Sequence, residues 1–177
     1  MDGNSHGYNR FFDMMENKIK LFVPLGTQKF PFNRLVKALN GLVESGVYTP
    51  SEIVMQSTVY EEKPKFIHFD IIPLESFNSY LDNAEVIITH SGVNSIISSM
   101  NRKKPLIIVP RMKKYGEHVD DHQIEIADLM EQKFNVLVAK DTAKLAELIK
   151  QAKRHQYKQY QSKNAELIEA IRNVINN

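Results

Sequence analysis

The chain has 177 residues, of which 42% are hydrophobic, and its formal net charge is +2. This length fits one well-buried core and is short for two ordinary domains, while the mixing of both charge signs excludes a general attraction to nucleic acid or an acidic membrane. The absence of cysteine excludes disulfides, thiolate metal ligands and a cysteine nucleophile. No apolar run approaches the roughly 20 residues of a membrane-spanning helix, so we expect a cytoplasmic protein.

Residues 1–17 are polar, contain scattered aromatic residues and show no clear period. We interpret them as a mobile leader without an assigned function. In residues 18–177, short apolar runs alternate with amphipathic stretches, a pattern typical of strands and helices that alternate around a parallel sheet. The prediction is a single α/β domain with a Rossmann-like, doubly wound parallel sheet of about six strands.

Apolar runs and helical repeats predict the individual elements in chain order. The predicted strands cover residues 19–23, 53–56, 66–69, 86–89, 106–109 and 136–138. The predicted helices cover residues 32–43, 74–81, 91–100, 121–132 and 141–148, with Asp141 as the cap of the fifth. The last segment, 157–175, is amphipathic and predicts a final helix. Its apolar stripe could dock a partner or pack on its own domain, and consists of Tyr160, Leu167, Ile168, Ile171 and Ile175.

In a doubly wound sheet, ligands bind outside the carboxyl ends of the strands. Small and polar residues follow these predicted ends at 26–28, 56–58, 70–74, 89–95 and 110–123. The dinucleotide pattern GxGxxG and the P-loop pattern GxxxxGK[ST] are both absent, so the usual NAD and ATP or GTP sites lose their main support. Spacing alone supports no catalytic triad and no glycosidase-like carboxylate pair.

The most informative segment is 86–97, where an apolar strand runs into a small polar turn that opens a helix. Gly92 allows the backbone to approach a ligand, and the free N–H groups from Val93 onward would bind an anion such as a diphosphate. His90 is a candidate phosphate ligand or proton carrier. The alternative is an ordinary helix start capped by Ser or Asn, with a structural histidine.

The loop after the strand at 106–109 adds candidates for the same ligand. Arg111 and the two lysines that follow could complement a diphosphate, or form an ordinary solvated charge run. The histidines and aspartates at 118–122 resemble a metal cluster, but the run straddles a loop and a helix start, so its members cannot all face one point and we predict no metal. Gln123, in the first turn of the next helix, could reach sugar hydroxyls.

Three segments together, residues 26–28, 89–96 and 104–123, resemble the C-terminal, donor-binding half of GT-B glycosyltransferases of family 28. Among these, the chain looks like the short PssE-like subunits of bacterial capsule and exopolysaccharide synthesis. A eukaryotic relative of such subunits is the soluble subunit of the dolichol-linked N-acetylglucosaminyltransferase. The resemblance covers about residues 18–150.

This resemblance implies the UDP-sugar-binding subunit of a two-component hexosyltransferase. A membrane-associated partner would hold the lipid-linked saccharide acceptor and recruit this chain to the inner face of the membrane. No metal or cofactor and no nucleic acid is implied, and the catalytic candidates are His90, Glu117 and His122. The residues implied for donor binding are Gly26, Thr27, Gln28, Ile72, Leu74, His90, Ser91, Gly92, Val93, Asn94, Ser95, Arg111, Glu117, His122 and Gln123.

Two positions depart from the family pattern. Family members commonly have a more glycine-rich turn where this chain has residues 91–95, and the peptidoglycan-forming relative has a ribose-binding glutamate where this chain has Ser98. These departures leave an alternative open, namely a non-catalytic enhancer that stabilises a membrane-associated glycosyltransferase partner.

Overall fold

The computed structural model describes residues 19–158, 160 and 165–175. Their strands form one sheet in the order β3-β2-β1-β4-β5-β6, and every neighbouring pair is parallel. The strands are β1 (Leu21–Pro24), β2 (Ile53–Gln56), β3 (Ile67–Phe69), β4 (Val86–Thr89), β5 (Leu106–Ile108) and β6 (Leu137–Val138). The predicted doubly wound, Rossmann-like sheet is confirmed, and its order is the usual one of that fold.

Helices follow the strands along the chain. They are α2 (Asn33–Glu44), α3 (Leu74–Asn83), α4 (Val93–Asn101), α5 (His122–Phe134), α6 (Leu145–Ala152) and α7 (Ala165–Ile175), with 3-10 turns η1 (Pro50–Glu52), η2 (Lys113–Tyr115) and η3 (Thr142–Lys144). The first five predicted helices are confirmed. Asp141 caps η3, which leads into α6, through a bond from the Ala143 N–H.

The last predicted segment needs a correction, because its helix begins at Ala165 and not at residue 157. Within the predicted stripe, Ile171 is buried in the core, and the ring of Tyr160 packs edge-on against Phe134 at 5.8 Å. The side chains of Leu167, Ile168 and Ile175 lie outside the described part of the structure. The described members of the stripe therefore pack on their own domain.

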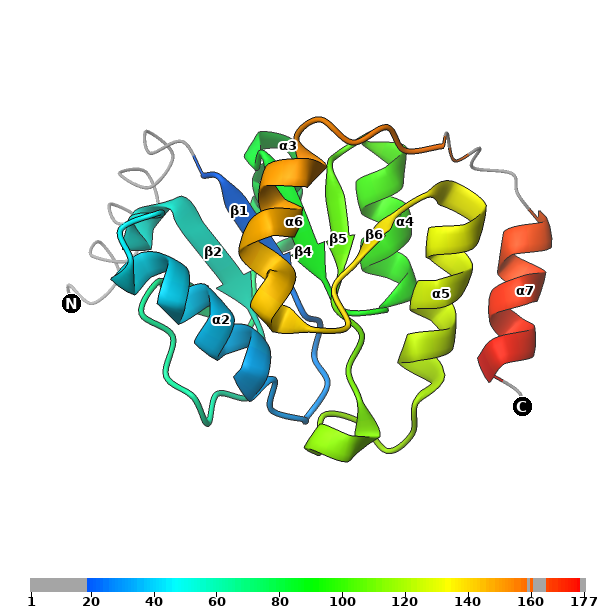
Figure 1. Ribbon diagram of the computed structural model, residues 1–177, viewed down its shortest axis with the longest axis horizontal. Coiled ribbons are helices and arrows are strands. Elements are labelled where there is room, and N and C mark those ends of the chain that lie inside the picture. The colour runs from blue at the N-terminus through cyan, green and yellow to red at the C-terminus, as the bar shows by residue number, and fades with distance from the viewer. Residues whose placement is uncertain (1–18, 159, 161–164, 176–177) are drawn as a thin grey trace, which may run out of the picture.

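The sheet is covered on both faces (Figure 1). Helices α2 and α6 pack on one face, whereas α3, α4 and α5 pack on the other and α7 lies beside α5. Side chains of β1 alternate accordingly: Leu21 and Val23 face α2 and α6, and Phe22 faces the opposite layer. Burial on both faces explains why the strands are continuous apolar runs in the sequence.

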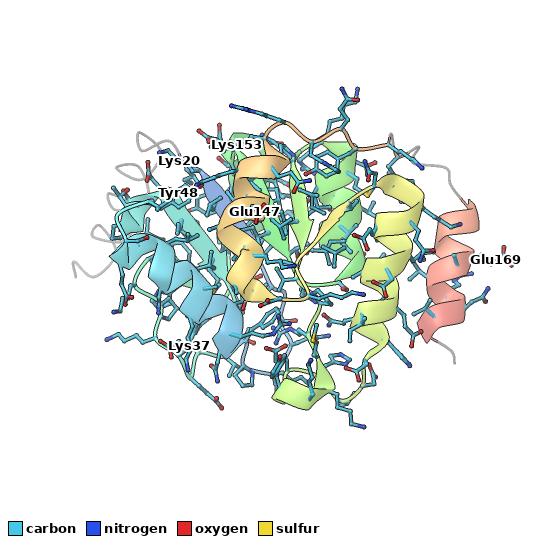
Figure 2. The ribbon with its side chains drawn as sticks, in the orientation of Figure 1. Lys20, Lys37, Tyr48, Glu147, Lys153 and Glu169 are labelled. Carbon is cyan, nitrogen blue, oxygen red and sulfur yellow. The ribbon has the colours of Figure 1, made fainter. Side chains whose placement is uncertain are left out.

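The order in which strands are added to the sheet reverses at β1: β2 and β3 lie on one side of it, and β4, β5 and β6 lie on the other. The helices after β1 and β4 therefore pack on opposite faces, and the carboxyl edge at such a reversal is the usual ligand site of doubly wound sheets. The amino edge instead carries ion pairs, between Lys20 and Glu52 at 2.5 Å and between Lys153 and Glu85 at 2.5 Å, with Tyr48 close to both lysines (Figure 2). No helix within the described residues is long and apolar enough to span a bilayer.

Candidate functional site

The loop after β1 lies at the carboxyl edge of the sheet. Gly26 has a φ of +68°, a left-handed conformation that glycine adopts without strain. The buried side chain of Gln56 donates from Nε2 to the carbonyl oxygens of Gly26 at 3.0 Å and Asp70 at 2.8 Å. It therefore fixes the loops after β1 and β3 relative to each other. Thr27 is exposed and Gln28 is partly exposed, so both can reach a ligand.

The turn between β4 and α4 lies at the same edge. Its cap residue Gly92 is extended, and no side chain caps α4. The predicted alternative of a Ser or Asn cap is therefore not found. Since helix geometry gives the first N–H groups no acceptor inside the helix, those of Val93, Asn94 and Ser95 remain available to an anion. Asn94 is exposed at this positive end of the helix dipole.

His90 lies between the loop after β1 and the turn after β4 and is only 6% exposed. Its Nε2 is 3.5 Å from the position that a Cβ would take on Gly26 and 2.5 Å from that position on Gly92. Burial, together with the charge of Arg111, lowers the pKa of His90 to about 4. The ring is therefore neutral at pH 7 and can serve an anion as a hydrogen-bond donor, not as a cation. Its Nδ1 has no hydrogen-bond partner among the described residues.

The amide of Gln123 joins three loops at the carboxyl edge of the sheet. Its Oε1 accepts the N–H of Ser91 at 3.3 Å and the N–H of Arg111 at 3.0 Å, and its Nε2 lies 3.5 Å from Gln28 Oε1. Ser91 Oγ also donates to the Gln123 carbonyl at 2.6 Å. The predicted residues Gln28, Ser91, Arg111 and Gln123 are thus brought together, chiefly by contacts with one another.

The structure corrects the prediction for Arg111, which is 0% exposed and does not face an open cleft. Its Nη1 donates to the Phe30 carbonyl at 2.8 Å, and its guanidinium lies 4.6 Å from the centre of the Phe32 ring. Nε and Nη2 have no hydrogen-bond partner among the described residues. Burial lowers the pKa of Arg111 to about 10, so the side chain remains a buried cation at pH 7.

Glu117 needs a similar correction, because its side chain is committed to the protein. Its two carboxylate oxygens lie 2.8 and 3.0 Å from Arg34 Nε, and Oε2 also accepts the N–H of Met112 at 3.0 Å. Arg34 donates in addition to the Pro110 carbonyl. Glu117 is 2% exposed and forms a buried ion pair, so it is not placed to meet a donor sugar.

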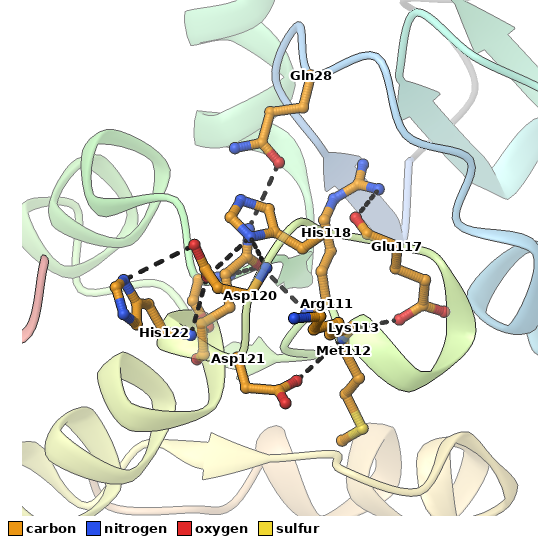
Figure 3. A network of polar contacts seen from close by, with 11 residues as sticks. Gln28, Arg111, Met112, Lys113, Glu117, His118, Asp120, Asp121 and His122 are labelled. Atoms are coloured by element: carbon orange, nitrogen blue, oxygen red, sulfur yellow. Dashed lines mark hydrogen bonds and ion pairs between the residues drawn. The ribbon is translucent and has the colours of Figure 1, made fainter.

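His122 begins α5 and remains partly exposed. Asp120 lies between two histidines: its Oδ1 is 2.9 Å from His118 Nδ1, and its Oδ2 is 3.8 Å from His122 Nδ1 (Figure 3). Desolvation raises the pKa of Asp120. The bond from the His122 N–H and the two imidazoles lower this pKa by more, so the net pKa lies below its ordinary value. Within the described ranges, no group of three or more His, Asp or Glu side chains is arranged to hold a metal ion.

The apolar candidates lie at the same edge of the sheet, after β3. Ile72 is half-buried against the core, whereas Leu74 is 75% exposed at the first position of α3. Two residues outside the predicted donor-binding set shape the site, Arg34 and Gln56. A glutamine at the end of a buried strand was the available signal for Gln56, whereas nothing local marks Arg34.

A family comparison covers most of the chain. The model of the glycosyltransferase family 28 C-terminal domain matches residues 20–177. The chain belongs to this family. The described fold agrees with a solution structure of ALG13, which it matches with a TM-score of 0.55 at 19% identity over 88% of this chain and 95% of that one.

Two yeast proteins share more sequence over shorter stretches. Both are named UDP-N-acetylglucosamine transferase subunit ALG13. The protein from Candida albicans is 40% identical over 52 residues, which are 29% of this chain and 16% of that protein. The protein from Debaryomyces hansenii is 30% identical over 95 residues, which are 53% of this chain and 42% of that protein. The matched part of the chain therefore spans less than half of each yeast protein.

Proposed function

We propose that this protein is the UDP-sugar-binding subunit of a two-component glycosyltransferase. The observation that carries the proposal is the uncapped start of α4 beside the neutral ring of His90, at the carboxyl edge where doubly wound sheets bind ligands. Family membership supports glycosyl transfer, and the names of the two yeast relatives favour UDP-N-acetylglucosamine as the donor. The proposed activity needs the UDP-sugar as substrate and no further cofactor.

The chemistry follows from the charge that develops during transfer. As the bond to the sugar breaks, negative charge grows on the departing UDP. The fixed N–H groups of Val93, Asn94 and Ser95, together with the dipole of α4, stabilise that charge more strongly in the transition state than in the ground state. No metal is required for this. In this proposal Gly26 and Thr27 line the cleft for the donor.

The remaining donor contacts are assigned by position along the carboxyl edge. Ile72 and Leu74 lie beside the uracil. His122 approaches the donor sugar, since its side chain is partly exposed to solvent. A membrane-associated partner supplies the lipid-linked acceptor and the general base for its hydroxyl, and it recruits the otherwise cytoplasmic chain to the membrane. The proposed setting is capsule or exopolysaccharide synthesis, as in the PssE-like subunits that the sequence resembles.

A second candidate is a non-catalytic enhancer that stabilises its glycosyltransferase partner. The burial of Arg111 and Glu117 favours this alternative, because it removes two of the side chains expected to contact the donor. Both candidates need a partner, but only the first needs a nucleotide site in this chain. Nucleotide binding therefore distinguishes them.

The test is calorimetric titration of the purified chain with UDP, with ADP and GDP as controls. We expect selective UDP binding that is weakened by Asn94→Asp, which adds a negative charge at the exposed start of α4, and not by Asn101→Asp, at the end of the same helix. If millimolar UDP does not bind, the titration is repeated with the membrane partner present. Absence of binding in the complex as well would favour the enhancer.

A further inference from the structure

A cavity of about 350 Å³ opens at the amino edge of β5 and β6, the end of the sheet opposite the candidate donor site. Its volume lies within the range of cavities that hold small ligands in proteins. The end of α4, the first residue of β5 and the segment between α6 and α7 enclose it. That segment runs along the amino edge of the sheet toward α7 (Figure 1). The function proposed above makes no use of this cavity.

The floor of the cavity is apolar and uncharged. Leu106 and Val136 are each 1% exposed, and Met100 is a half-buried part of the same lining. Tyr157 contributes its ring, because its hydroxyl accepts the Leu106 N–H at 3.1 Å and lies 3.2 Å from the Leu106 carbonyl oxygen. Burial raises the pKa of this hydroxyl to about 12, so it is neutral at pH 7. The floor therefore suits the apolar body of a ligand.

The rim of the cavity is positively charged. Lys103, Lys104 and Lys158 line it, and none of the described lining residues is acidic. The ammonium group of Lys104 binds the carbonyls of Asp82 and Ala84, so it is held by backbone oxygens and not by a carboxylate. Lys103 and Lys158 are exposed, and their ammonium groups form no hydrogen bond or ion pair with the described residues. Two positive charges therefore remain for an anion at the mouth of the cavity.

The backbone of Lys103 is left-handed, with a φ of +54°. Its N–H donates to the Met100 carbonyl at 2.9 Å, and the next N–H donates to the Ser99 carbonyl at 3.1 Å, which is a common way to end a helix. Glycine usually occupies this position, because other residues are strained there. A glycine would therefore end α4 with less strain than Lys103 does. Helix stability alone does not explain a lysine on the rim at this position.

We propose that this cavity binds a small amphiphilic anion. Its apolar body lies over Leu106 and Val136, and its carboxylate or phosphate group lies between Lys103 and Lys158. Because the apolar floor is buried beneath the rim, the ligand is a single molecule that enters the cavity and not the surface of a bilayer. The proposal is independent of the donor site, which lies at the other edge of the sheet.

The first test is a calorimetric titration of the full chain with octyl phosphate, octyl glucoside and inorganic phosphate, with both octyl compounds below their micelle concentrations. We expect octyl phosphate to bind about tenfold or more tightly than the other two, because only it has both the apolar chain and the anionic group. Its binding should shift the NMR signals of the Met100, Leu106 and Val136 methyl groups. Equal affinity for octyl glucoside, or no binding of octyl phosphate, would overturn the proposal. Binding only to vesicles that contain phosphatidic acid would also overturn it and would assign the lysines to a membrane surface.

The second test separates the charge of Lys103 from its backbone conformation. In Lys103→Gly we expect a higher urea midpoint and about a fivefold loss of octyl phosphate affinity, the scale of one exposed ion pair. Lys103→Met and Lys158→Met should lose the same affinity without the gain in stability. Lys63→Met, at an exposed lysine between β2 and β3, should change neither quantity, and UDP affinity should stay at its wild-type value in all four variants. Wild-type octyl phosphate affinity in Lys103→Met and Lys158→Met would overturn the proposal.

Discussion

The imidazole of His90 lies so close over Gly92 that a Cβ on residue 92 would be 2.5 Å from its Nε2. The absence of a side chain at this position is therefore a condition for the observed place of the ring. The same glycine begins α4 without a side-chain cap. One residue thus determines both the position of the buried histidine and the access of a ligand to the helix N–H groups.

Gly92→Ala should displace the His90 ring or the turn. We expect the free energy of unfolding to fall by about 1–3 kcal/mol, as for other overpacked positions, and UDP affinity to fall with it. Calorimetry and urea unfolding measure the two effects. Gly41→Ala is the control: no atom lies within 4 Å of its added Cβ, and an alanine inside α2 should raise stability by about 0.5–1 kcal/mol. Equal stability of Gly92→Ala and wild type would contradict the prediction.

His90 should make the protein less stable in acid. In the unfolded chain its pKa is near 6.5, whereas burial lowers the folded value to about 4. The unfolded state therefore binds the proton first as the pH falls, and the free energy of unfolding decreases between about pH 6.5 and 4, by about 3 kcal/mol in all. Above pH 6.5 this contribution is constant. In His90→Gln the corresponding part of the pH dependence, measured by urea unfolding, should disappear. An NMR titration of the ring near pH 6.5 would rule this account out.

Glu117→Gln should lower stability by about 3 kcal/mol, because it leaves the largely buried guanidinium of Arg34 without its carboxylate. A double-mutant cycle with Arg34→Gln measures the coupling energy directly. Lys37→Gln is the control, since the Lys37–Glu62 pair is exposed and its atoms are 3.9 Å apart, so we expect a change within about 1 kcal/mol. Wild-type stability of Glu117→Gln with loss of glycosyl transfer would instead assign Glu117 to the substrate.

Tyr157→Phe should destabilise the amino end of β5. The Tyr157 hydroxyl accepts the N–H of Leu106 at 3.1 Å and lies 3.2 Å from its carbonyl oxygen. Loss of this group leaves a backbone N–H without its acceptor, at a cost of about 1–2 kcal/mol. Tyr115→Phe is a matched control, because that ring is exposed and its hydroxyl makes no hydrogen bond to the described residues. Equal urea midpoints for the two variants would contradict the assignment.

The strands could be predicted because both faces of the sheet are buried. Continuous apolar runs such as that of β4 are typical of strands buried on both faces. The order of helices and strands follows from the alternation of these runs with amphipathic segments. The first predicted strand was placed two residues too early, since Ile19 is buried but β1 begins at Leu21. Burial of a side chain does not require that its backbone belong to the sheet.

The sequence placed the candidate residues after the strand ends, but it could not predict the partners of their side chains. An arginine after a strand resembles an exposed charge, but Arg111 is covered by Phe32 and by carbonyl groups of the loop after β1. Glu117 pairs with Arg34, which is 83 residues away in the sequence. Such partners depend on how distant loops fold over one another, and no local pattern contains that information.

The register of β1 differs between its two neighbours. With β2 it extends over all four residues, to Pro24, whereas with β4 it covers Leu21 and Phe22 only. Farther along, these two strands are joined by the bond from Thr89 Oγ1 to the Pro24 carbonyl, at 2.7 Å. After β1, Gln56 binds the carbonyl of Gly26, and after β4, Gln123 binds the N–H of Ser91. Beyond Phe22, a side-chain hydrogen bond therefore takes the place of the backbone ladder between β1 and β4.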